Sequence, residues 1–330
     1  MTTSTDAPAL SAIQTHTQAE NPAAFLALNE GTAYFTAPGL DGVIAYRPVG
    51  RYHVQFGGPF AADADYLPLL RAFREHTHAA GAKVVAVQLQ RHDAERYAAD
   101  GYTVNQVGAS YSVDLAEFTM AGTRFMRLRN KIARSARAGL TVQEVDFDQW
   151  ADRVADLDRT WLRGKGEDTR ELGFLVGQRG GHLQPHRRLF AGVLDGELAG
   201  YISYSPVYGT RSGWLHDLSR RVPGELPGIM ESINATAIDT FRGEGAGWLH
   251  FGFTPFTGLA DALELPTVHF GFAQIVKVLF EHGEALYPAR TQLAYKQKWY
   301  PHLVTPEYLA FDGEADLAAF AHVFRAAGAF

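Results

Sequence analysis

The run of residues 124–137 gathers six cations and no acidic residue in a chain whose formal net charge is -6. At helical spacing four of these cations fall on one stripe, and Phe125, Leu128 and Ile132 form the neighbouring stripe. One side of such a helix can pack on a core while the other presents guanidinium groups, which bind two phosphate oxygens at once. The cations are Arg124, Arg127, Arg129, Lys131, Arg134 and Arg137.

Three interpretations of this basic run stay open on the pattern alone. It is a solvated helix face, as most charge runs are. It is a surface for the phosphate backbone of a nucleic acid, local to a protein whose total charge repels that ligand. Or it attaches the protein to an anionic membrane surface as a basic amphipathic helix.

Other kinds of chemistry find little support in the sequence. The chain has no cysteine, which excludes disulfides, thiolate metal sites and a cysteine nucleophile. His182 and His186 are four residues apart, but Pro185 spoils the helix that would pair them on a metal. The glycines of Gly243-x-Gly245-x-Gly247 precede a strand, so they predict a turn rather than a dinucleotide loop. We expect neither a metal site nor a nucleotide cofactor.

The length and composition of the chain limit the class of protein to which it can belong. A length of 330 residues predicts two domains, because single cores stop growing at about 250–300 residues. A hydrophobic content of 46% and a charged content of 20% are typical of soluble globular proteins. No apolar run is long enough for a transmembrane helix, and the polar first 20 residues lack the apolar core of a signal peptide. We therefore expect a flexible N-terminal tail and a cytoplasmic protein.

The elements that must position the chemistry recur in two halves. Strands are predicted at 33–35, 43–46, 52–56, 84–89 and 111–115, with helices at 66–80 and 94–99 before the basic run. In the second half strands are predicted at 189–194, 198–204, 214–218 and 248–253, with a helix at 229–241. Asp195-Gly196 predicts a hairpin turn. The helix–glycine–strand units lie roughly 160–165 residues apart, which indicates an internal duplication.

The order hairpin, strand, glycine-rich loop, helix, strand is that of the GNAT acyltransferase fold. In that fold the loop carries Gln/Arg-x-x-Gly-x-Gly/Ala, and its amides hold the coenzyme A pyrophosphate at a helix N-terminus. Here Arg221-x-x-Gly224-x-Leu226 keeps half of the motif, and Pro223 and Pro227 each remove an N–H donor. The sequence therefore predicts a GNAT-like scaffold whose acyl donor is not acetyl-CoA.

Short stretches in a fixed order carry a closer resemblance. They are Gly42-Val-Ile-Ala-Tyr-Arg47, Gly57-Gly-Pro59, Gly108-Ala-Ser-Tyr-Ser-Val-Asp114-Leu, Phe118, Gly122, Arg127-Leu-Arg129-Asn-Lys131, Trp161, Lys165, Glu171-Leu-Gly-Phe174, Gly177, Asp217-Leu-Ser-Arg220, Gly228-Ile-Met-Glu231, Phe251-Gly-Phe-Thr-Pro255, Tyr287 and Tyr295-Lys296-Gln-Lys298-Trp-Tyr-Pro301. From about Gly31 to Phe311 the chain thus resembles the catalytic domain of the lysyl-phosphatidylglycerol synthases and their stand-alone relatives. That family has a tandem GNAT-like fold and moves an aminoacyl group from charged tRNA. Leu293 and Glu231 depart from its usual Arg and Asp.

The resemblance implies aminoacyl-tRNA as the co-substrate, with no other cofactor. An aminoacyl ester is already activated, so positioning and electrostatics can supply most of the rate without a covalent intermediate. Lys296 and Lys298 are the candidate catalytic cations for the oxyanion, and the alternative is a basic strand edge that prevents pairing.

Four further residues are candidates for the substrate site. Asp217 at a strand end and Glu231 near the start of the next helix could meet around the ammonium group, and Asp217 also counts as catalytic. Either carboxylate could instead be structural, since a helix N-terminus favours negative charge. Arg220 either binds the tRNA end or pairs with Asp217, and Tyr295 joins them by resemblance. His216 is a weaker candidate base, because strand alternation turns it away from Asp217.

We therefore expect an α/β (α+β) protein with two tandem GNAT-like domains, each a mixed sheet flanked by helices. The expected parts are a flexible tail (1–25), an N-terminal domain ending in the basic helix (26–140), a C-terminal domain (141–311) and a C-terminal helix (312–330). The expected activity is tRNA-dependent aminoacyl transfer to a hydroxyl or amine of a small molecule. The alternatives are a lipid head group with peripheral membrane contact, an acyl-CoA acetyltransferase, and an inactive binding module. In this family context tRNA contact becomes the favoured role of the basic helix.

Overall fold

The protein is described by a computed structural model that covers residues 6–17, 21–164, 172–224, 226–282 and 288–328. The strands are β1 (Ala33–Phe35), β2 (Gly42–Val49), β3 (Tyr52–Ala61), β4 (Lys83–Leu89), β5 (Thr103–Asp114), β6 (Thr141–Val145), β7 (Arg188–Leu194), β8 (Glu197–Val207), β9 (Gly213–Arg221), β10 (Trp248–Pro255) and β11 (Leu303–Phe311). The α-helices are α1 (Asp6–His16), α2 (Asp63–Ala79), α3 (Arg91–Ala99), α4 (Met126–Arg137), α5 (Phe147–Arg163), α6 (Ile229–Gly243), α7 (Phe270–His282), α8 (Ala289–Gln297) and α9 (Leu317–Ala326). Short 3-10 turns are η1 (Ala24–Leu28), η2 (Thr123–Phe125), η3 (Gln184–His186) and η4 (Asp261–Leu263).

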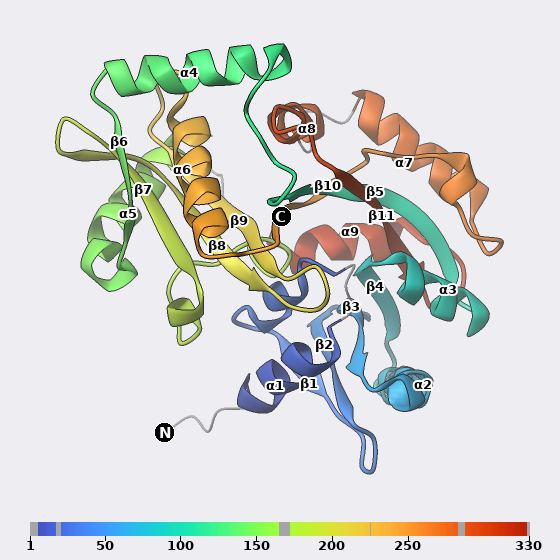
Figure 1. The fold of residues 1–330 in the computed structure, drawn as a ribbon. Helices are drawn as coiled ribbons and strands as arrows, with labels where there is room; N and C mark the ends of the chain where they lie inside the picture. Colours follow the sequence, from blue (N-terminus) through green and yellow to red (C-terminus); the bar gives the residue numbers. More distant parts are fainter. Residues whose placement is uncertain (1–5, 18–20, 165–171, 225, 283–287, 329–330) are drawn as a thin grey trace.

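All of these strands form one mixed sheet with helices packed around it (Figure 1). The strand order is β1-β2-β3-β4-β11-β5-β10-β9-β8-β7-β6. Each half contains antiparallel strands followed by one parallel pair, β3 with β4 and β9 with β10. The crossover helices are α2 in the first half and α6 in the second, so the predicted duplication and fold class are confirmed.

The two halves interlock rather than forming separate sheets. Strand β5 pairs with β10 across the junction, and β11 from the end of the chain lies between β4 and β5. The expected boundary after residue 140 therefore divides no sheet, and residues 303–311 pair with strands of the first half. Periodicity along the chain predicts a strand but not its partners, because pairing is a non-local choice.

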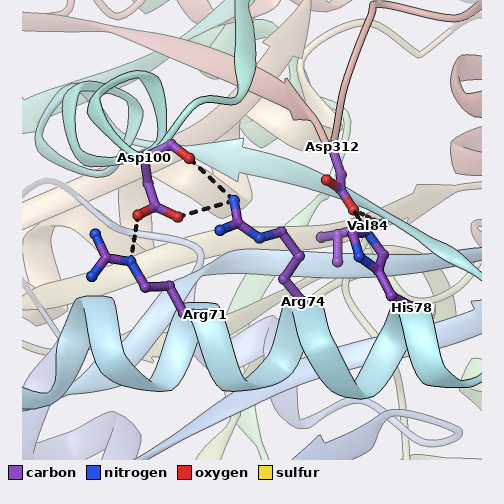
Figure 2. A network of polar contacts seen from close by, with 6 residues as sticks. All are labelled: Arg71, Arg74, His78, Val84, Asp100 and Asp312. Carbon is purple, nitrogen blue, oxygen red and sulfur yellow. Dashed lines mark hydrogen bonds and ion pairs between the residues drawn. The ribbon is translucent and has the colours of Figure 1, made fainter.

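A polar network on helix α2 helps to hold β11 in the first half. Arg71 and Arg74 bind Asp100 at 2.6 and 3.1 Å, and His78 Nε2 lies 2.5 Å from Asp312 Oδ2 (Figure 2). Asp312 directly follows β11, and its carboxylate also accepts from the backbone N–H of Val84 in β4 at 3.5 Å. Spacings of three and four residues put Arg71, Arg74 and His78 on one helix face.

The prediction of a flexible tail over residues 1–25 is wrong for its described part. Helix α1 buries Ala9 and Ile13 against the first-half sheet, and residues 24–28 of η1 are all buried. Alanine-rich helices give a weak apolar signal, and tertiary packing rather than propensity orders them. At the other end α9 confirms the predicted C-terminal helix, and the Ala326 carbonyl accepts from Arg47 Nη1 at 2.9 Å.

Replacing Ile13 by alanine should lower the free energy of unfolding by about 2–4 kcal/mol, because its side chain is 0% exposed. The matched control is Thr15→Ala on the exposed face of the same helix, which should change stability by less than about 0.5 kcal/mol. Urea unfolding of both variants makes the comparison. Equal stability of the two variants would mean that α1 does not pack as described.

Candidate functional site

The second half of the sheet opens where β9 and β10 part. These parallel strands pair only over Gly213–Leu215 and Trp248–His250, although both continue further. Beyond the paired residues β10 has an irregular register around Gly252, whose φ of 67° favours glycine. Helix α8 packs against β10 here. Ligands bind open α/β sheets where neighbouring strands separate, so the side chains around this opening form the candidate site.

The two lysines expected to be catalytic differ in their surroundings. Lys296 is buried, and its Nζ donates to the carbonyls of Gly252 and Phe253 at 2.8 and 2.9 Å. Burial lowers the pKa of Lys296 to about 7, against the opposing charge of Glu307. Lys298 keeps 35% of its side chain exposed. The strand-edge alternative is wrong, because Lys296 lies in α8 and Lys298 is its C-cap.

Glu231 connects three helices at one point. It lies in the first turn of α6, and its Oε1 accepts from Lys298 at 2.9 Å and from Lys131 of α4 at 3.4 Å. Burial raises the pKa of Glu231, but the hydrogen bond and charge of Lys298 outweigh it, so the net pKa is lowered. The carboxylate is therefore ionised and fixes the Lys298 ammonium at the edge of the opening.

Helix α4 covers the start of α6. Ser135 and Ser232 hydroxyls lie 2.7 Å apart, and a Cβ on Gly228 would lie 2.4 Å from the Lys131 carbonyl oxygen. The amides at this helix start are the ones that would bind a coenzyme A pyrophosphate. Because the Glu231 carboxylate and α4 occupy that space, the geometry disfavours coenzyme A as donor.

Asp217 belongs to a different cluster from Glu231. Its side chain is buried, its Oδ2 accepts from Ser205, and Arg187 Nε lies 3.9 Å away. His216 points instead toward α6, where its Nδ1 lies 3.4 Å from Asn234 Oδ1. Adjacent strand residues face opposite sides, so Asp217 faces away from α6, the helix that carries Glu231. The structure therefore does not bring Asp217 and Glu231, the two expected ligands of the ammonium group, together.

Arg187 is the residue at Asp217 that the sequence did not reveal. Its Nη2 donates to Asn29 at 3.2 Å, and its guanidinium lies 5.1 Å from the Phe25 ring centroid. Gly177 covers Asp217 so closely that a Cβ there would lie 2.7 Å from its backbone carbon. Arg187 follows a short turn and has no periodic neighbours, so no local pattern marks it.

The stability contribution of Asp217 should depend on pH. Burial raises its pKa from 3.8 to about 6, with Arg187 and Ser205 opposing. A raised pKa means that the folded state loses stability as pH rises through about 6, by up to about 3 kcal/mol. The test is urea unfolding of wild type and Asp217→Asn at about pH 4 and about pH 7.5. The free energy of unfolding of the wild type should fall relative to that of the variant as pH rises. Exposed Asp195→Asn is the control, and a pH-independent difference for Asp217→Asn would contradict the expectation.

Arg220 of β9 lies against helix α5. Its guanidinium stacks over the Trp161 ring at 4.0 Å, and its Nε lies 3.9 Å from Asp158 Oδ1. Tyr201 also donates to that buried carboxylate, at 2.7 Å. Arg220 is therefore built into the contact between β9 and α5.

Tyr295 connects α8 to the start of α6. Its hydroxyl donates to the Met230 carbonyl at 3.3 Å, and its ring packs edge-on against His216. Burial lowers the pKa of His216 to about 3, so this imidazole is neutral. Lys165, Glu171 and Tyr287, which also carried the resemblance, lie outside the described residues.

The basic helix has the two faces that its sequence predicts. Phe125 and Leu128 are buried, and Ile132 is partly buried. Five of the six cations are exposed, and Lys131 is the half-buried one that binds Glu231.

Within the described part of the chain, only some of these arginines have partners. Arg129 donates to the Gly122 carbonyl at 2.8 Å and so anchors the preceding loop, and Arg124 lies over aromatic rings. Arg127, Arg134 and Arg137 make no side-chain contact with another described polar group. These three remain available to an external anion.

Fold and site together define a tandem GNAT-like transferase scaffold with a lysine–glutamate pair at its open strands. Residues 11–311 match the family described as phosphatidylglycerol lysyltransferase, C-terminal, and the chain belongs to that family. Two solved structures share the fold with a TM-score of 0.80. One is the C-terminal domain of a putative lysylphosphatidylglycerol synthetase from Agrobacterium fabrum (23% identity, 98% of this chain and 97% of that one). The other is L-PGS from Bacillus licheniformis (20% identity, 98% and 96%).

Curated relatives are longer than this chain. The phosphatidylglycerol lysyltransferase of Bacillus subtilis is 24% identical over 86% of this chain and 32% of its own length. The MprF-like domain protein Rv1619 of Mycobacterium tuberculosis is 26% identical over 79% of this chain and 55% of its own length. In the described residues of this chain, no helix is both long and apolar enough to cross a membrane.

Proposed function

We propose that the chain transfers an aminoacyl group from aminoacyl-tRNA to a hydroxyl of a phosphatidylglycerol-type head group. The family match over residues 11–311 carries this proposal, because relatives in it are named for lysyl transfer to phosphatidylglycerol. The small-molecule acceptor favoured by the sequence stays a prediction. Coenzyme A is disfavoured by the carboxylate and helix that fill the start of α6.

In the proposed reaction the acceptor oxygen attacks the ester carbonyl carbon and the carbonyl oxygen becomes an oxyanion. The bond to the ribose oxygen of the tRNA then breaks, and that oxygen takes up the proton lost by the acceptor. Lys298 is the proposed oxyanion donor, because Glu231 is the only hydrogen-bond acceptor of its ammonium among the described residues, which leaves two N–H groups for the oxyanion.

Three other expected site residues receive positioning roles in this proposal. Lys296 holds the irregular part of β10 through two backbone carbonyls. Asp217 is enclosed with Arg187 and Ser205, and Arg220 is fixed against Trp161. None of them needs to touch the reacting atoms, since their contacts fix the strands on which the site is built.

The exposed arginines of α4 are the proposed tRNA contacts. They form a local positive surface that binds phosphates against the overall charge of -6. Lys131 of helix α4 contacts Glu231, and Glu231 also binds Lys298. The proposed RNA surface therefore adjoins Lys298, the proposed oxyanion donor.

The test incubates the protein with tRNA charged with radiolabelled amino acids and vesicles with or without phosphatidylglycerol. Label should enter the lipid fraction only with phosphatidylglycerol, and RNase should abolish the transfer. Transfer to a water-soluble acceptor instead would support the small-molecule prediction. Turnover with acetyl-CoA that resists RNase would overturn the proposed donor.

A further inference from the structure

Tyr300 occupies a backbone position that suits glycine better than an aromatic residue. It follows α8 and Lys298, and its backbone N–H donates to the Gln297 carbonyl at 3.1 Å. Its φ is 49°, in the left-handed region where helices usually end on glycine. The residue is nevertheless 43% exposed. The end of helix α8 therefore does not explain why this position carries a tyrosine rather than a glycine.

Three contacts hold the Tyr300 ring in place at the start of the basic helix. Its hydroxyl donates to the Arg124 carbonyl at 3.3 Å, and its ring meets the buried Phe125 ring edge-on at 5.0 Å. The Arg124 guanidinium lies 5.1 Å from the Tyr300 ring centroid. An exposed aromatic ring and an arginine are thus fixed side by side, two residues from Lys298.

We propose that Tyr300 and Arg124 form a stacking platform for an unpaired base at the 3′ end of tRNA. This inference rests on the proposed aminoacyl-tRNA donor. Unpaired bases stack on tyrosine rings and arginine planes with little sequence preference, which suits the CCA end that all tRNAs share. The exposed arginines of α4 follow Arg124 along the chain and can hold backbone phosphates.

The position of the platform fits the proposed chemistry. Tyr300 follows Lys298 by two residues, and its contacts with Arg124 join the end of α8 to the turn η2 that leads directly into α4 (Figure 1). A base held there keeps its ribose ester near the Lys298 ammonium. The platform positions the donor and takes no part in bond breaking, so it acts on donor binding.

The experiment compares an RNA hairpin that ends in single-stranded ACCA with the same hairpin lacking the overhang. Wild type should bind the overhang hairpin about tenfold more tightly. Tyr300→Gly and Tyr300→Ala should remove that preference, and Tyr300→Phe should retain it. Tyr300→Gly relieves the left-handed backbone, so a folded variant is expected, with the thermal midpoint measured alongside. Val304→Ala, another exposed apolar site, is the control.

Different failures have different meanings in this experiment. If Tyr300→Ala keeps the overhang preference, the platform is overturned while the proposed donor stands. If wild type binds neither hairpin, the proposed tRNA donor itself fails. If the Tyr300 variants lose binding to anionic vesicles but not to RNA, the residue serves a membrane surface and the inference is equally overturned.

Discussion

Replacing Lys298 by methionine should lower turnover by about 100- to 1,000-fold, the usual loss when one oxyanion donor is removed. Lys298 is the partly exposed lysine at the opening of the sheet, and Glu231 fixes its ammonium at 2.9 Å. The effect should fall on kcat, with little change in the RNA concentration needed for half saturation, because the oxyanion exists only after attack. Steady-state transfer of labelled amino acid to phosphatidylglycerol vesicles measures both quantities.

Two variants make the Lys298 result specific. Lys277→Met removes a lysine of α7 that pairs with a single carboxylate, Asp261 at 2.7 Å, and should leave turnover unchanged. Lys298→Arg keeps a cation beside Glu231 and should recover part of the rate. If Lys298→Met keeps turnover within about threefold of wild type, the oxyanion role is wrong.

The structure separates two lysines that the sequence could not tell apart. Both lie in the same short motif, yet Lys296 donates to two backbone carbonyls while the partly exposed Lys298 donates to the buried Glu231. A side chain's direction depends on the helix turn and on what packs beneath it. Neither was available from the sequence, which predicted a strand edge as the alternative to catalysis.

The sequence predicted those parts of the fold that depend on residues close together in the chain, such as helix faces and hairpin turns. The apolar stripe of the basic helix is buried as its spacing requires, at Phe125 and Leu128. The hairpin at Asp195-Gly196 forms with positive φ values of 52° and 82°, as its residue types predict. The parallel crossovers followed from the repeated order of strands and helices.

Long-range placement was the part that the sequence could not supply. The insertion of β11 between β4 and β5 depends on pairings that join residues far apart in the chain. The separation of Asp217 from Glu231 depends on which face of β9 carries Asp217, and the Arg187 partner of Asp217 comes from another segment. These are choices of register and packing that no local motif records.

Reversing two arginines of the basic helix, as Arg127→Glu with Arg134→Glu, should weaken tRNA binding by about 100-fold at low salt. Both side chains are exposed, and within the described residues neither contacts another polar group, so the fold loses nothing on reversal. Each phosphate contact contributes about 0.9 to the slope of log affinity against log salt, so the slope should fall by about two. Filter binding across a salt series gives affinity and slope together.

A double reversal of equal charge elsewhere decides whether this loss is local. Arg51→Glu with Arg242→Glu changes two exposed arginines away from α4, and it should leave most of the affinity intact. If both double variants lose affinity equally, binding responds only to net charge and α4 is a solvated face. If only the α4 variant loses affinity and its salt slope falls, a protein of net charge -6 holds RNA through one local surface. Lys131 lies within the same helix, and its contact with Glu231 connects that surface to Lys298.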